Sequence, residues 1–514
     1  MSTTVKTGKG ELRGAAEGGL VTFRGIPFAR PPIGELRFRA PQEATPWQGV
    51  RDATRFGPRA VQVPNEALEA ILGRPEDQPP LDEDCLYLNV WTPGLDDRRR
   101  PVMVWIHGGG FTIGAGSDPI YDGSALASRD VVVVTINYRL GPFGFLYVPG
   151  FADAAGETCA NFGILDQIAA LKWVQAEIAA FGGDPGNVTI FGESAGAMSI
   201  GTILGSPLAT GLFHKAILQS GAAHQVLTQD VAAANTAAFV EALGMAKSDA
   251  AALRARPVED MLEAQTKLEA ESGWAARRGL GLGLRYQPVI DGHVVSQPAI
   301  NEIRNGSARD VPILIGTTLD EYKLFAVMVP HLREISEDEA AKRVSYLLPG
   351  RDIERARSML RAYRQARAAR GEATDPYELV CAAVTDWLFR VPADRLAEAQ
   401  AAQRQRVFAY RLDWRSPVGE GILGACHAID LPFVFGTHHL TRRWVGKGAD
   451  VDALAATIGD AWVTFARSGD PSTDALPWPA FDTTHRKTVV LNHDCRVEEQ
   501  PREQERRCWD GIIR

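Results

Sequence analysis

Long apolar runs are absent from the sequence of 514 residues. No stretch of 18 or more apolar residues occurs, and residues 1–14, MSTTVKTGKGELRG, lack the apolar core of a secretion signal. The sequence therefore gives no sign of a membrane-spanning helix or of a signal peptide. We expect a cytoplasmic protein without a membrane span.

An excess of positive charge is also missing. The chain carries 55 Lys and Arg against 63 Asp and Glu, which gives a net charge of −8. Nucleic acid is therefore not an expected partner. The arginine-rich segment 351–370 could suggest a nucleic-acid or lipid surface, but the acidic balance favours a solvated helix face there.

Cysteine is scarce, and no C-x-x-C pair occurs. The six cysteines are scattered, a pattern that argues against a disulfide framework or a zinc site and favours buried free thiols. Internal repeats and low-complexity linkers are lacking as well. We therefore expect residues 1–514 to form one large domain rather than two separate ones.

Short branched apolar runs alternate with longer helix-like segments such as residues 164–181. Continuous rather than alternating hydrophobicity is typical of strands covered on both faces, as in a parallel sheet. The series predicts an α/β fold with a doubly wound, mostly parallel sheet and a ligand site beyond the carboxyl ends of its strands. Segments 222–310 and 326–405 look like helical insertions that form a cap and pocket walls above that edge. The predicted strands are residues 101–107, 130–138, 187–192, 214–221, 311–318 and 406–414.

The pentapeptide GESAG at residues 192–196 directly follows one of these predicted strands. Its G-x-S-x-G spacing lets a strand turn sharply into a helix and leaves Ser194 exposed at the apex. A serine hydroxyl is a poor nucleophile at neutral pH, so it needs a base, a carboxylate that orients the base, and donors for the oxyanion. The rest of the sequence should supply these three features.

A glycine run, HGGGF at residues 107–111, follows the first predicted strand. Bare backbone N–H groups can point into a pocket without side-chain obstruction, so this run predicts an oxyanion hole. The alternative is a flexible turn. The position upstream of a G-x-S-x-G motif favours the oxyanion hole.

The acid and the base should follow Ser194 in that order along the chain. The predicted strand 311–318 ends in Leu319-Asp320-Glu321, which offers two carboxylates at the correct edge of the sheet. His427 lies in a glycine-rich loop directly beyond the predicted strand 406–414. Chemistry alone leaves Asp320 and Glu321 as alternatives for the acid.

With these motifs in place, the sequence resembles the type-B carboxylesterases, in particular the bacterial p-nitrobenzyl-type esterases. The resemblance implies an α/β-hydrolase fold in which Ser194 is the nucleophile, Glu321 the acid and His427 the base. It also implies an oxyanion hole formed by Gly109, Gly110 and Ala195. The similarity runs almost end to end, through FRGIPFARPPIGELRF (23–38), EDCLYLNVWTP (83–93), HGGGF, NYRLGPFGFL (137–146), NFGILDQ (161–167), FGGDPGNVTIFGESAG (181–196), AILQSG and HAIDLPFVFG (427–436).

The resemblance implies a serine carboxylesterase that works through an acyl-enzyme on a small-molecule ester and needs no cofactor or metal. Two alternatives stay open, a carbamate or amide hydrolase with the same triad and, less favoured, a non-catalytic binding member of the fold. The oligomeric state, monomer or dimer, is also left open by the sequence.

Two departures from the family pattern bear on the expected location of the protein and on its expected substrates. Ala60 stands where many secreted members carry a cysteine that pairs with the equivalent of Cys85, which indicates an intracellular, bacterial setting. Residues 73–85, GRPEDQPPLDEDC, contain none of the aromatic residues with which cholinesterases bind quaternary ammonium groups. We therefore expect no preference for choline esters.

Four apolar side chains are expected to line the substrate pocket. Phe111 follows the oxyanion glycines and Phe143 lies in GPFGFL, whereas Leu282 and Leu284 alternate with glycines in the segment that the resemblance assigns to the acyl side. Such walls favour uncharged esters of short to medium acyl length. A mobile insertion that never touches substrate is the alternative for the leucine segment.

Overall fold

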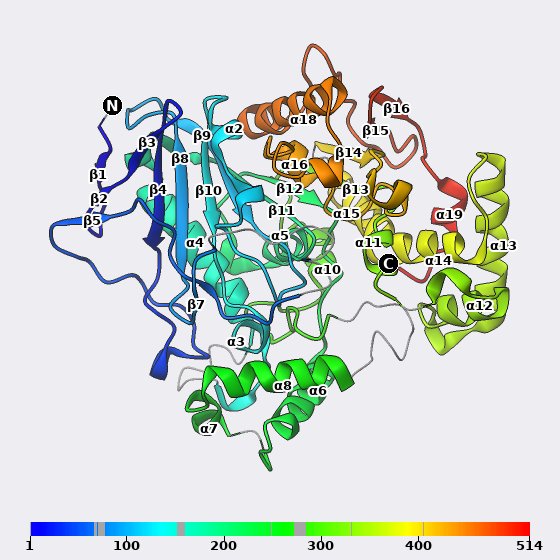
Figure 1. The fold of residues 1–514 in the computed structure, drawn as a ribbon, viewed down its shortest axis with the longest axis horizontal. Helices are drawn as coiled ribbons and strands as arrows, with labels where there is room; N and C mark the ends of the chain where they lie inside the picture. The colour runs from blue at the N-terminus through cyan, green and yellow to red at the C-terminus, as the bar shows by residue number, and fades with distance from the viewer. Residues whose placement is uncertain are drawn as a thin grey trace.

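Figure 1 shows the computed structural model, in which helices cover both faces of a twisted central sheet. The structure describes residues 2–65, 69, 78–151, 160–247, 249–271, 284–329, 331–403 and 406–513. No helix within these ranges is both long enough and apolar enough to cross a bilayer.

Eleven strands of the described chain form the central sheet, in the order β16-β15-β14-β13-β12-β11-β9-β10-β8-β4-β3. The strands from β15 to β10 run parallel, and antiparallel strands extend both edges. The six predicted strands correspond to β9 through β14, so the predicted mostly parallel α/β fold is confirmed. The bounds are β3 Ala15–Glu17, β4 Leu20–Pro27, β8 Tyr87–Thr92, β9 Arg100–Ile106, β10 Val132–Ile136, β11 Gly183–Glu193, β12 Lys215–Gln219, β13 Ile313–Thr318, β14 Val407–Leu412, β15 Thr488–Leu491 and β16 Arg496–Glu498.

Side chains of each central strand point alternately to two apolar cores. In β9, Val104 and Ile106 face the core covered by α4 (Phe162–Glu177), α5 (Ala195–Gly205) and α15 (Val391–Ala401). Met103 and Trp105 face the opposite core, which is covered by α16 (Leu431–Val434) and α18 (Ala449–Ser468). Burial on both faces explains why these strands read as continuous apolar runs.

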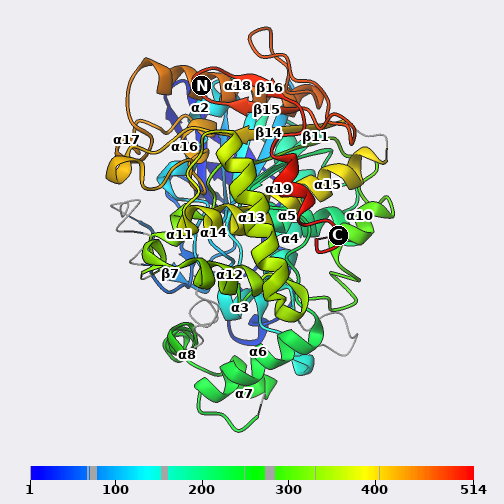
Figure 2. The ribbon, with the colours of Figure 1, turned by 90° about the vertical axis from the view of Figure 1, so that its right-hand side faces the viewer.

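The two predicted insertions carry most of the remaining helices. Figures 1 and 2 place α6, α7 and α8 together at one end of the molecule, whereas α12, α13 and α14 gather at its side around a third apolar cluster. That these groups form a cap and pocket walls stays a prediction. Their bounds are α6 Gln229–Ala242, α7 Ala250–Arg254, α8 Val258–Glu271, α10 Ala299–Arg304, α12 Glu337–Ser345, α13 Ile353–Ala369 and α14 Pro376–Thr385, and a π-helical turn, Asp386–Arg390, joins α14 to α15.

Short elements complete the chain. The strands β1, β2 and β5 form a small sheet near the N-terminus, and β6 pairs with β7 beside the central sheet. The bounds are β1 Thr4–Lys6, β2 Glu11–Arg13, β5 Val50–Asp52, β6 Arg59–Ala60, β7 Leu81–Asp82, α2 Ser124–Ala127, α3 Gly141–Phe145, α11 Lys323–Ala326, α17 Arg442–Val445 and α19 Glu503–Arg507.

Candidate active site

Ser194 lies at a sharp turn between β11 and α5. Its backbone has φ 54° and ψ −124°, a conformation that a non-glycine residue rarely adopts and that marks stored strain. Neighbouring β9 packs so closely that a Cβ on Gly196 would lie 1.9 Å from the carbonyl oxygen of Ile106, and one on Gly192 2.7 Å from the same atom. Only glycine fits both positions, and the half-buried Ser194 is left at the carboxyl edge of the sheet.

His427 and Glu321 meet at the same edge, where they follow β14 and β13. Nδ1 of His427 lies 2.6 Å from Oε2 of Glu321, whose side chain is fully buried. The other carboxylate oxygen, Oε1, accepts hydrogen bonds from the Ser220 hydroxyl at 2.6 Å and from the backbone N–H of Thr318 at 2.7 Å. Glu321 is thereby held in one orientation toward the imidazole.

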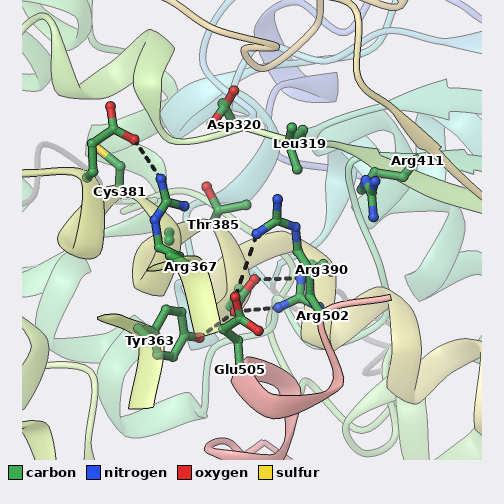
Figure 3. A pocket seen from close by; sticks show the side chains of 13 residues that line it. Leu319, Asp320, Tyr363, Arg367, Cys381, Thr385, Arg390, Arg411, Arg502 and Glu505 are labelled. Atoms are coloured by element: carbon green, nitrogen blue, oxygen red, sulfur yellow. Dashed lines mark hydrogen bonds and ion pairs between the residues drawn. The ribbon is translucent and has the colours of Figure 1, made fainter. Parts of the chain in front are cut away.

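Asp320 points elsewhere, although it is the neighbour of Glu321 in sequence. Its Oδ2 accepts a hydrogen bond from the backbone N–H of Ala425 at 3.0 Å, and its Oδ1 lies 3.5 Å from Nζ of Lys323. Figure 3 shows the side chain of Asp320 at the edge of a charged cavity. Of the two carboxylates that the sequence left as alternatives, Glu321 is the one that contacts His427.

The cavity of Figure 3 is lined by arginines whose charges are paired. Arg502 and Glu505, from the segment around α19, meet Glu372 and Arg370 at the end of α13. The remaining arginine pairs are Arg367 with Glu378 at 3.1 Å, Arg390 with Asp386 at 2.5 Å and Arg411 with Asp413 at 2.6 Å. The arginine charges that line this cavity are therefore matched by carboxylates of the protein itself.

The second imidazole nitrogen faces a further carboxylate. Nε2 of His427 lies 3.1 Å from Oε1 of Glu193, and the structure has no hydrogen bond between the described side chains of Ser194 and His427. Burial raises the pKa of the Glu193 carboxyl to about 8. Burial disfavours the charged imidazolium and so acts to lower the pKa of His427. The carboxylates of Glu193 and Glu321 act in the opposite direction and more strongly, so the pKa is raised to about 9.

Sequence reasoning assigned no role to three buried groups around His427, namely Glu193, Ser220 and Asp430. Burial raises the pKa of Asp430 to about 6, and the side-chain amide of Gln219 donates to its Oδ2 at 2.7 Å. All three groups lie in motifs that the sequence displays, GESAG, AILQSG and HAIDLPF. The motifs mark them as candidates, but only the fold shows which side chains they meet.

The glycine run forms a tight loop beside Ser194. Gly109 and Gly110 have φ values of 103° and 61°, and a Cβ on Gly108 would lie 3.1 Å from the Cβ of Ser194. The carbonyl oxygen of Gly109 accepts hydrogen bonds from the N–H groups of Thr112 and Ile113 and so closes the turn. Within the described part of the chain, no hydrogen bond uses the N–H of Gly109 or Gly110.

Of the four predicted wall residues, Leu284 lies at this loop. A Cβ on Gly110 would approach its Cδ2 to 3.3 Å. Phe111 is fully buried against Phe145, with ring centroids 5.0 Å apart, and Phe143 is buried beside Phe38. Contact of these two rings with a substrate therefore stays a prediction. Leu282 and the segment around Pro75 lie outside the described residues.

Ala60 and Cys85 line one small cavity, together with the side chain of Arg139. Cys85 is buried and free there, because Ala60 offers no sulfur. The other described cysteines are also free, and Cys159 lies outside the described residues.

Comparison with known proteins shows the family of the chain. A model of the carboxylesterase family matches residues 1–509. The para-nitrobenzyl esterase of Bacillus subtilis (strain 168) is 40% identical over 505 residues, which cover 98% of this chain and 97% of the relative. The phenmedipham hydrolase of Pseudarthrobacter oxydans is 39% identical over 502 residues, which cover 95% of this chain and 94% of the relative.

Solved structures give the same result. The crystal structure of a Geobacillus stearothermophilus carboxylesterase at pH 6.2 has a TM-score of 0.86 and 40% identity, and the match covers 99% of this chain and 100% of that one. A solved structure of a PNB esterase has a TM-score of 0.84 and 38% identity, with 99% of each chain covered. The family expected from the sequence motifs is thereby confirmed. The chain belongs to the carboxylesterase family with its α/β-hydrolase fold, and it is a carboxylic ester hydrolase.

Proposed function

We propose that Ser194, His427 and Glu321 form the catalytic triad of this esterase. The observation that carries the proposal is the 2.6 Å contact between His427 Nδ1 and Glu321 Oε2 beside a serine held on a strained turn. A carboxylate in this position fixes the imidazole tautomer and stabilises the imidazolium that forms during attack.

In the first half of the reaction, the Ser194 hydroxyl attacks the ester carbonyl and His427 Nε2 takes its proton. Nε2 faces Glu193 in the resting site, so the imidazole and the hydroxyl must first come together. His427 then gives the proton to the leaving alcohol, and an acyl group stays on Ser194. Water repeats the cycle on this acyl-enzyme and releases the carboxylic acid.

The negative charge of the tetrahedral intermediate falls on the former carbonyl oxygen. The N–H groups of Gly109, Gly110 and Ala195 are the proposed donors to it, because the glycine loop lies directly against Ser194. Donors of this kind contribute about 3–4 kcal/mol each to lowering the barrier. These residues need neither a metal nor a cofactor for the reaction.

The proposed substrates are uncharged esters of short to medium acyl length. Leu284 beside Gly110 supplies apolar surface for the acyl group, and segments 222–310 and 326–405 are the proposed cap and walls within one domain. Similarity to the para-nitrobenzyl esterase supports ester substrates. Hydrolysis of carbamates by the same triad is a second candidate function, which similarity to the phenmedipham hydrolase favours.

The proposed location is the bacterial cytoplasm. The five described cysteines are free, and Cys85 faces Ala60 instead of a disulfide partner. A reducing compartment suits this arrangement. The compared relatives from Bacillus subtilis and Pseudarthrobacter oxydans are bacterial.

A fluorophosphonate probe tests the proposed nucleophile. We expect stoichiometric labelling of Ser194 in the wild type, and we expect Ser194→Ala to lose both labelling and ester turnover with an unchanged melting temperature. Labelling of another residue, or wild-type turnover in the variant, would contradict the proposal. A panel of p-nitrophenyl esters, matched carbamates and anilides then separates the two candidate functions by kcat/KM.

A further inference from the structure

Gln62 lies just beyond β6, in the FGPRAVQ segment that departs from the family pattern at Ala60. Its side chain is buried, and its amide forms two hydrogen bonds with one backbone residue, Gly114. Oε1 accepts from the N–H of Gly114 at 2.8 Å, and Nε2 donates to the carbonyl oxygen of Gly114 at 3.1 Å. Nε2 also donates to the carbonyl oxygen of Ala60 at 2.9 Å. The amide thus bonds both the N–H and the carbonyl oxygen of Gly114, as the backbone of a neighbouring strand would.

Gly114 in turn supports the start of the glycine loop. Its φ is +113°, and a Cβ there would lie 2.5 Å from Nδ1 of His107 and 2.8 Å from the carbonyl oxygen of Gly108. The backbone at Gly114 therefore packs directly against the residues that lead into Gly109. The hydrogen bond from Ile113 N–H to the carbonyl oxygen of Gly109, at 3.0 Å, connects the two ends of the turn.

Other side chains hold the loop further along, at Gly116. Asn137 Oδ1 accepts from the N–H of Gly116 at 2.8 Å, and Thr135 Oγ1 donates to its carbonyl oxygen at 2.7 Å. These contacts attach the far end of the loop to the sheet. Among the described residues, the side chain that bonds Gly114, next to the turn itself, is Gln62.

We infer that Gln62 is a positioning residue that fixes the N–H groups of Gly109 and Gly110 for oxyanion stabilisation. The inference rests on the proposed function, in which these groups bind the developing negative charge. A loop rich in glycine loses much conformational freedom when it is ordered, so it needs outside contacts to keep its donors aimed. Preorganised donors stabilise a transition state, whereas donors that must reorganise during the reaction lose much of that effect.

Gln62→Met tests the role, because methionine has a similar length and removes every hydrogen bond of the amide. The matched control is Gln400→Met. Gln400 lies near the end of α15 and is also buried. Its Nε2 donates to the carbonyl oxygens of Ala308 and Val311, both at 2.6 Å. Both variants should lose stability, so a lower melting temperature alone does not distinguish positioning from simple support.

Catalysis does distinguish them. We expect Gln62→Met to lower kcat by about tenfold or more for esters of every acyl length, with KM within about twofold of wild type. A trifluoromethyl ketone adds to Ser194 and places its oxyanion in the same hole, so its inhibition constant should rise by the same factor. Gln400→Met should keep wild-type kcat and inhibition.

The inference is overturned if Gln62→Met matches Gln400→Met, with a lower melting temperature but wild-type kcat and ketone inhibition. Should the methionine variant not fold, Gln62→Asn beside Gln400→Asn gives the same comparison, because the shorter amide withdraws from its backbone partners without adding a charge. Failure of the proposed function would look different, because the fluorophosphonate would then not label Ser194 even in the wild type. Full labelling of Ser194 in Gln62→Met together with reduced kcat would show that the nucleophile is intact, and weaker ketone inhibition would then place the defect in the glycine loop.

Discussion

Oε1 of Glu193 lies 3.1 Å from Nε2 of His427, the nitrogen that has to receive the proton of the proposed nucleophile. Both side chains are buried, so their interaction is weakly screened by solvent. A carboxyl group therefore competes with the serine hydroxyl for the base in the resting enzyme. The same carboxyl group also favours the protonated imidazole, which cannot accept a further proton.

The pH dependence of kcat/KM should reveal this effect. His427 must be neutral to act as a base, and its raised pKa of about 9 means that activity falls as the pH drops through that region. The acid limb should therefore lie above about 6.5, the ordinary value for histidine. Glu193→Gln removes one of the carboxylates that raise the pKa, so we expect its acid limb to move to lower pH.

Asp320→Asn is the control for that shift, since Asp320 points into the cavity and not toward His427. Its acid limb should coincide with that of the wild type. An unchanged or higher apparent pKa in Glu193→Gln would show that Glu193 does not govern the protonation of His427.

Ser220→Ala should lower kcat by about tenfold, because it removes the hydroxyl that orients Glu321. Alanine keeps the Cβ and the φ of 52° that serine already adopts, so the hydroxyl is the only group removed. Steady-state kinetics measure the effect of the lost hydrogen bond on catalysis, and thermal unfolding measures any general loss of stability. Ser199→Ala removes a buried serine that bonds Gln167, and it should keep wild-type kcat. Equal kcat in both variants would exclude the orienting role.

Activity should rise from acetyl toward butyryl or hexanoyl esters, at about 0.8 kcal/mol per buried methylene until the pocket is filled. Leu284→Ala removes apolar surface beside Gly110, so we expect it to flatten this rise while kcat/KM for the acetate ester stays near wild type. A p-nitrophenyl ester series measures the slope. A steeper rise in the variant, or better turnover of acetylcholine than of an uncharged acetate of equal size, would contradict this picture of the pocket.

Thiol titration of the denatured, unreduced protein should detect close to six groups, the full number of cysteines in the sequence. The described cysteines are free, and Ala60 leaves Cys85 without a sulfur partner. Dithiothreitol should accordingly change neither the melting temperature nor the activity. Four groups or fewer would reveal a disulfide.

Much of the site could be predicted from sequence because its residues stand at fixed places relative to strands. Ser194, Glu321 and His427 each follow an apolar run that becomes a sheet strand, and parallel strands bring their carboxyl ends to one edge. The contact between Ser220 and Glu321 spans 101 residues, and the one between Gln62 and Gly114 spans 52 residues. No local spacing encodes such pairs, because they depend on how distant segments pack. The same holds for Asp320 and Glu321, which are adjacent in sequence and differ in that Glu321 contacts His427 in the folded structure.

The pairing of Glu321 with His427 also constrains how the protein is made. After the ribosome has completed β13 and Glu321, it must add a further 106 residues to reach His427. Burying a carboxylate without its partner is costly, so a nascent chain should keep this edge of the sheet open to water until then. Folding of the N-terminal strands can begin early, but the proposed triad is complete only after His427 has been added. A chain whose synthesis stops before His427 lacks the proposed base, so we expect it to have no esterase activity rather than a reduced one.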